Sequence, residues 1–80
     1  MKLPRNLSGA SLIKVLIKHF DYVQVNQVGS HVILETEDPS HQRIAIPNHK
    51  MLRVGTLNSV ISSVAKHKQI NKAAVLEVLS

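Results

Sequence analysis

The spacing of apolar residues changes twice along this chain, and these changes fix the order of the elements that it can form. Between residues 8 and 20 the apolar side chains follow the period of one face of a helix. Between residues 23 and 46 they alternate with polar side chains in three short runs, which is the period of a half-buried strand. The helical spacing returns at residue 57, so the pattern predicts a helix, three strands and a second helical region.

The first helix should begin after Ser8, whose side chain can cap its free amides. Its apolar stripe consists of Leu12, Ile13, Leu16, Ile17 and Phe20. Ser11, Lys14 and Lys18 fall on the opposite side. This helix should therefore present a basic outer face.

Three strands are expected, over residues 23–26, 31–37 and 43–46. The turn at residues 28–30, a polar loop around Pro39 and the strand-ending Pro47 delimit them. Short connections favour an antiparallel meander. The side chains expected to face the core are Val23, Val25, Val32, Leu34, Ile44 and Ile46.

That register places His31 on the open face of the sheet. Gln24, Asn26 and Arg43 would be its neighbours there, and Ile33 would share the face. His31 is therefore not expected to be a core histidine.

The second long helix should begin between Arg53 and Thr56. Its apolar stripe is Leu57, Val60, Ile61 and Val64. Asn71 can cap a short final helix that carries Val75, Leu76 and Leu79. The resulting fold class is α+β: a two-layer α-β-β-β-α sandwich whose helices pack on one face of a three-stranded antiparallel sheet. A chain of 80 residues can bury one core, so residues 1–80 should form a single domain.

Charge points to a polyanionic partner. Ten Lys and Arg residues against five Asp and Glu residues give a net charge of +5, which favours nucleic acid. Only 2% of the residues are aromatic, which argues against recognition by base stacking. Cysteine is absent, which excludes disulfides and thiolate metal sites. No stretch has the length of a signal peptide or a membrane span, and we interpret the chain as cytoplasmic, with no membrane partner.

His31 is the candidate catalytic residue. The five histidines lack a short metal-ligand spacing, so no metal site is expected, and neither a glycine-rich phosphate loop nor a nucleophile elbow is present. An exposed imidazole can transfer a proton near neutral pH. Because RNA supplies its own nucleophile, the 2′-hydroxyl, a single histidine can assist RNA cleavage without a metal. The alternative is an inert surface histidine.

Three segments together resemble the HicA-type toxins, small mRNA interferases with a fold related to the double-stranded RNA-binding domain. They are "GSH" at residues 29–31, "IPNHKMLRVGTLNSVI" at residues 46–61 and "LSGASLIKVL" at residues 7–16. The similarity spans roughly residues 2–64. Val32 and Ile33 stand where the family often has a second histidine or an aromatic residue.

The resemblance implies a toxin of a type II toxin–antitoxin system. Its catalytic histidine would be His31, its proline-x-histidine would be Pro47 and His49, and the Gly-Thr that opens the second long helix would be Gly55 and Thr56. It further implies endonucleolytic cleavage of mRNA without a metal or other cofactor, and a HicB-type antitoxin that covers the active face.

Several residues are candidates for RNA binding. Gly29 permits a close approach of the backbone to a phosphate, and Ser30 can donate a hydrogen bond to it. The other candidates are the cationic or titratable side chains Lys14, Lys18, Arg43, His49, Lys50 and Arg53. Ordinary turn chemistry and a solvated basic surface are the structural alternatives.

Two other functions stay open at this point. A non-catalytic module that binds structured RNA would show salt-dependent binding without any product. A protein-interaction domain would use the basic face to meet an acidic partner.

Overall fold

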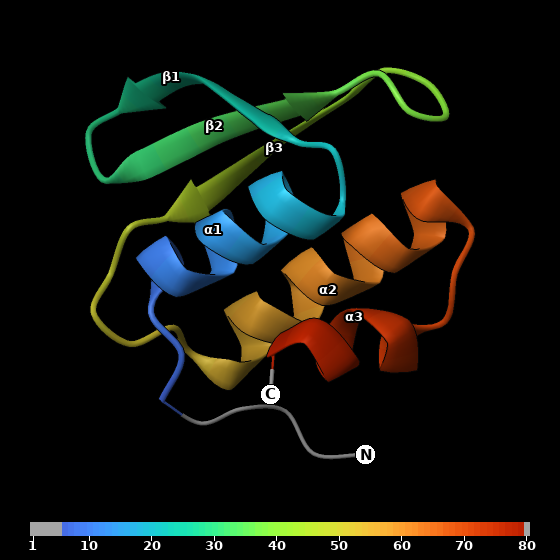
Figure 1. The fold of residues 1–80 in the computed structure, drawn as a ribbon. Coiled ribbons are helices and arrows are strands. Elements are labelled where there is room, and N and C mark those ends of the chain that lie inside the picture. Colours follow the sequence, from blue (N-terminus) through green and yellow to red (C-terminus); the bar gives the residue numbers. More distant parts are fainter. Residues whose placement is uncertain (1–5, 80) are drawn as a thin grey trace.

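Two helices, α1 and α2, lie against one face of a three-stranded sheet, and a third, α3, packs on them from the side away from the sheet (Figure 1). The computed structural model describes residues 6–79, and residue 2, with which the family resemblance begins, lies outside that range. The elements are α1 (Gly9–His19), β1 (Val23–Val28), β2 (His31–Thr36), β3 (Gln42–Pro47), α2 (Val54–Lys68) and α3 (Lys72–Leu79). The predicted order and the α+β class are confirmed. In the described part of the chain, no helix is long and apolar enough to cross a membrane.

The helix boundaries follow the sequence signals. The Ser8 hydroxyl accepts a hydrogen bond of 3.0 Å from the amide of Ser11, so the predicted cap of α1 is confirmed. Helix α2 begins at Val54, within the predicted interval, and α3 begins directly after Asn71. At the end of α2, Gln69 adopts a left-handed conformation that closes the helix.

One hydrophobic core joins the helices to the central part of the sheet. Val32 and Leu34 of β2 and Ile46 of β3 are buried in it, and Ile44 packs against it. The helices contribute Leu12, Ile13, Leu16, Leu57, Ile61, Val64, Ala65, Val75 and Leu76. Ile17, which was expected in the buried stripe of α1, is instead 41% exposed.

Strand β1 corrects the predicted register. Val23 and Val25 were expected to face the core, but they are 57% and 47% exposed. The pairing of β1 with β2 shifts between Gln24 and Asn26, so Val25 is the extra residue of a bulge. The bulge moves Val23 opposite Glu35, on the open face, and Gln24 opposite Leu34, on the core face. Strict alternation of side chains therefore fails at this edge strand.

The loop between β2 and β3 is held by the end of α2. The ammonium of Lys68 donates a hydrogen bond of 2.9 Å to the Thr36 hydroxyl and another to the Asp38 carbonyl. The Nε2 atom of His67 lies 2.8 Å from the carbonyl oxygen of Ser40. These contacts fix the far end of the β2–β3 hairpin on the helical layer.

The start of α1 packs tightly against the end of β3. A Cβ atom on Gly9 would lie 2.0 Å from the carbonyl oxygen of Pro47 and 3.0 Å from the Cα atom of Asn48. The amide of Gly9 donates a hydrogen bond of 2.9 Å to the carbonyl of His49. Only a residue without a side chain permits this approach. By contrast, a Cβ atom on Gly55 would meet no atom of residues 6–79 within 4 Å.

We therefore expect Gly9→Ala to lower the free energy of unfolding by about 1–3 kcal/mol, because the added methyl group forces backbone apart. The matched variant Gly55→Ala should leave stability unchanged or raise it by up to about 1 kcal/mol, because alanine favours the helix. Urea unfolding followed by circular dichroism measures both. Equal stability of the two variants would contradict the close contact at Gly9.

Candidate active site

His31 is the first residue of β2 and follows the tight turn formed by Gly29 and Ser30. Gly29 has a φ of 59°, the left-handed conformation that glycine adopts without strain. His31 pairs with Val28 on β1 and with Pro47 on β3. Because the next residue, Val32, faces the core, the His31 side chain belongs to the open face, and it is exposed. The predicted exposure of His31 is confirmed.

Backbone hydrogen bonds tie this turn to the segment after β3. The amide of Asn48 donates a hydrogen bond of 2.6 Å to the Ser30 carbonyl, and the His49 carbonyl accepts one of 2.9 Å from Gly9. A third, of 2.8 Å, runs from the Leu52 amide to the Leu7 carbonyl. We call the surface formed by residues 29–31 and 47–53 the His31 corner. Hydrogen bonds thus connect the backbone of residues 29–31 to that of residues 47–53, and the latter to the start of α1.

The His31 corner is basic and contains no carboxylate. His49, Lys50 and Arg53 are all exposed there. Helix α2 follows directly, and its first turn has neither a side-chain cap nor an acidic residue. The free amides and the positive end of the helix dipole favour an anion at this position.

Two imidazoles of the corner are available for chemistry. The rings of His41 and His67 donate hydrogen bonds, to the Glu37 carboxylate and to the Ser40 carbonyl respectively. Within residues 6–79 the ring nitrogens of His31 and His49 have no hydrogen-bond partner. Both side chains are exposed.

The structure separates the other predicted residues from His31. Gln24 lies on the core face, and Arg43 lies opposite Glu35, four residues along β2 from His31, or roughly 13 Å. Arg43 also forms an ion pair of 3.3 Å with Glu35. Of the predicted neighbours, Asn26 alone shares the open face nearby, opposite Ile33. The predicted surroundings of His31 are therefore wrong for Gln24 and Arg43.

Lys14 and Lys18 are exposed on α1, as predicted. Along the helix axis they lie about 7 Å and about 13 Å from Gly9, which touches the His31 corner. Lys18 is thus close to the far end of α1. Lys14 is the nearer of the two to the corner.

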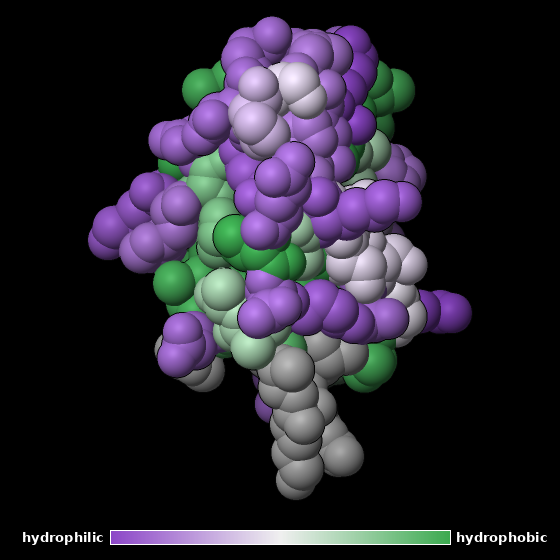
Figure 2. All heavy atoms as spheres, turned by 90° about the vertical axis from the view of Figure 1, so that its right-hand side faces the viewer, coloured by the Kyte–Doolittle hydropathy of each residue, from purple (hydrophilic) through white to green (hydrophobic). Residues whose placement is uncertain are grey.

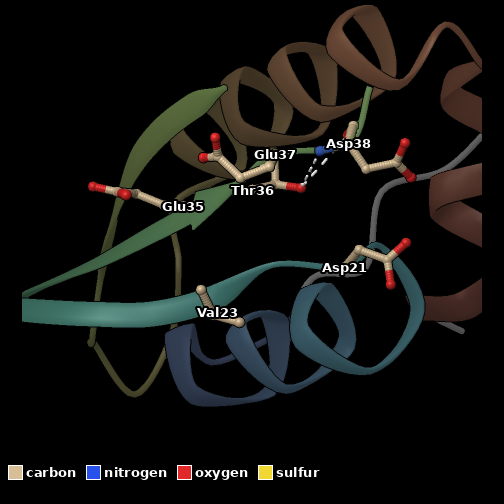
Figure 3. Close-up of a pocket in the computed structure, with 6 residues that line it drawn as sticks. All are labelled: Asp21, Val23, Glu35, Thr36, Glu37 and Asp38. Carbon is tan, nitrogen blue, oxygen red and sulfur yellow. Dashed lines mark hydrogen bonds between the residues drawn. The ribbon is translucent and has the colours of Figure 1, made fainter. Parts of the chain in front are cut away.

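Acidic residues gather at the opposite end of the sheet. A cavity of about 470 Å³ is lined by Asp21, Val23, Glu35, Thr36, Glu37 and Asp38 (Figure 3). These include four of the five acidic residues of the chain. Figure 2 views the molecule from the side of the β2–β3 loop, and hydrophilic side chains cover most of its upper half. The carboxylates repel a phosphate chain, so this cavity does not suit RNA.

Three possible metal ligands lie beside this cavity. Ligand atoms of Glu35, Glu37 and His41 all lie within 4.8 Å of one another. The spacing of the histidines does not indicate this cluster, because two of its three members are carboxylates. Each side chain already has a partner, since Glu35 pairs with Arg43 and Glu37 with His41. The cluster is at the other end of β2 from His31.

Comparison with known proteins gives one match. A family model described as the HicA toxin of bacterial toxin–antitoxin systems matches residues 9–70. The matched range runs from the start of α1 past the end of α2 and includes the whole His31 corner. No curated protein and no solved structure matches the chain.

At the acidic end of the sheet, the contact with Glu37 should raise the pKa of His41. The Nδ1 atom of His41 lies 2.6 Å from a Glu37 oxygen, and this hydrogen bond, followed by the charge of Glu37, raises the pKa of His41 above 6.5. We expect the NMR titration midpoint of His41 to lie above that of a free histidine and to fall in Glu37→Gln. Because the pKa is raised on folding, any stabilisation is present below pH 6.5 and is lost as the pH rises through the folded-state pKa. An unchanged midpoint in the variant would contradict the contact.

Proposed function

Because the chain belongs to the family of HicA toxins of bacterial toxin–antitoxin systems, we propose that it is an endoribonuclease that cleaves mRNA without a metal. The observation that carries the proposal is the state of His31. Its imidazole is exposed and has no hydrogen-bond partner among residues 6–79, and it lies at the basic end of the sheet. A proton-transfer group beside a phosphate-binding surface is what cleavage by the RNA's own 2′-hydroxyl requires.

The residues of the His31 corner supply the other functions of such a site. No atom of the described residues lies within 4 Å of where a Cβ atom on Gly29 would be, so a phosphate could approach the backbone of the turn. The hydroxyl of Ser30 can donate to a phosphate oxygen, while its carbonyl is already bonded to Asn48. Lys50, Arg53 and the first amides of α2 would neutralise the charge of the phosphate. His31 would transfer the proton.

The family also implies an antitoxin partner. We propose that this partner is of the HicB type and that it covers the open face around His31. Residues 1–80 would act as a single ribonuclease domain in the cytoplasm, where mRNA is found. A non-catalytic RNA-binding module is the competing proposal, because the same basic corner would bind RNA without His31 chemistry.

Replacement of His31 should abolish cleavage. We expect His31→Ala to lower the cleavage rate by about 10²–10⁴-fold on labelled RNA in EDTA, because the variant lacks the proton-transfer group. RNA affinity and the circular dichroism spectrum should stay nearly unchanged.

The matched control is His19→Ala, since His19 is also exposed but lies at the far end of α1. This variant should cut at the wild-type rate. Full activity of His31→Ala would contradict the catalytic assignment. Binding without any product from the wild-type protein in chelator would favour the binding module.

The cations of the corner should dominate RNA affinity. We expect Lys50→Gln to weaken binding and to reduce the slope of log affinity against log salt by about 0.7 for single-stranded RNA, because one phosphate contact is lost. Lys18→Gln, at the opposite end of α1, should change the slope less. Fluorescence titrations at several salt concentrations measure both slopes. A larger effect from Lys18→Gln would place the RNA elsewhere.

A further inference from the structure

We propose that His49 is a second catalytic residue, and that it forms an acid–base pair with His31. The inference rests on the proposed ribonuclease function and adds a residue to it. Cleavage through the 2′-hydroxyl needs two proton transfers, one from the nucleophile and one to the leaving group. One imidazole can do both only if it moves between the two oxygens. Two imidazoles on either side of the phosphate can do both in place.

The first support is the placement of His49. Its chain position is fixed on both sides by backbone hydrogen bonds, from the amide of Asn48 to Ser30 and from Gly9 to the carbonyl of His49 itself. The side chain is nonetheless exposed and its ring unbonded within the described residues. An exposed ring on an anchored backbone is the arrangement that holds a group toward a bound substrate.

The second support is proximity. His31 pairs directly with Pro47, and His49 is two residues further along. Paired Cα atoms lie about 5 Å apart and two residues extend about 7 Å, so the two histidine Cα atoms lie within roughly 12 Å. Two imidazole side chains can span a single phosphodiester over that distance.

The third support is the absence of another proton donor or acceptor in the corner. Its remaining charged groups are the cations Lys50 and Arg53. Ammonium and guanidinium groups keep their protons at neutral pH, so they bind phosphate and do not exchange protons with it. Four of the five carboxylates line the cavity at the other end of the sheet. His49 is therefore the group in the corner that can complement His31.

The reaction balances with these two groups alone. The neutral imidazole takes the proton of the 2′-hydroxyl, whose oxygen forms a bond to phosphorus. The bond from phosphorus to the 5′ oxygen breaks with its electron pair on that oxygen, and the imidazolium of the partner histidine protonates it. The products are a 2′,3′-cyclic phosphate and a 5′-hydroxyl end, and proton exchange with water restores both rings.

The test uses the full chain and a short RNA whose cleavage position has first been mapped with the wild-type protein. His49→Ala and His31→Ala should each lower kcat by at least about 10²-fold at saturating RNA, with smaller changes in KM. His49→Lys, which keeps a positive charge at this position, should be as inactive as His49→Ala. Circular dichroism and urea unfolding verify that each variant is folded.

The pH profile and a modified substrate then identify proton transfer. The wild-type rate should follow a bell-shaped curve, and each alanine variant should lose one limb, the two variants losing opposite limbs. The same RNA with sulfur in place of the 5′ bridging oxygen has a leaving group that needs no acid. It should restore the rate of the variant that lost its alkaline limb, and not that of the other variant.

Three results would overturn the role of His49 alone, while His31→Ala remains inactive. They are a wild-type kcat in His49→Ala, a loss confined to KM, or full activity in His49→Lys. Absence of cleavage by the wild-type protein would instead overturn the ribonuclease function on which the inference rests.

Discussion

The contact between the start of α1 and the end of β3 is the constraint on which the candidate site depends. Gly9 lies so close to the Pro47 carbonyl that a side chain has no room there. The Gly9 amide also donates a hydrogen bond to the His49 carbonyl. The same segment is bonded to the turn before β2 through Asn48 and Ser30. One close approach of two backbones therefore sets the relative position of both histidines of the His31 corner. Neither histidine side chain is used for that purpose.

The two ends of the sheet differ in the charge of their side chains. Its net charge of +5 would attract RNA to any surface, but the four carboxylates around the cavity at Asp21 and Asp38 remove one end of the sheet from that role. The His31 corner lies at the other end and carries cations only. In the proposed function, this distribution would direct a phosphate chain toward the imidazoles of the His31 corner. Arg43 lies toward the acidic end and is not a free cation, because it forms an ion pair with Glu35.

The sequence predicts most of this fold but only part of the site. Helical and alternating periods depend on neighbours within a few positions, so the boundaries of α1 and α2 and the exposure of His31 could be predicted. The bulge at Val25 could not, because a single extra residue leaves the alternation on both sides intact while moving Val23 to the other face. The contact of Gly9 with Pro47 and the grouping of Asp21 with Asp38 could not be predicted either, because each brings together segments that are distant in the sequence. Local patterns carry no information on such contacts.

Four of the five histidines are held in two different ways, and the difference bears on function. His67 and His41 are bonded through their rings, and in both cases the ring serves the loop between β2 and β3. At His49 the backbone carbonyl accepts the hydrogen bond, and at His31 the two neighbouring strands fix the backbone, so neither ring is bonded to another residue in the described part of the chain. A ring that stabilises a loop cannot exchange its proton without disturbing that loop. A ring on an anchored backbone can lose and regain a proton while the fold stays unchanged, which is the property that a catalytic imidazole requires.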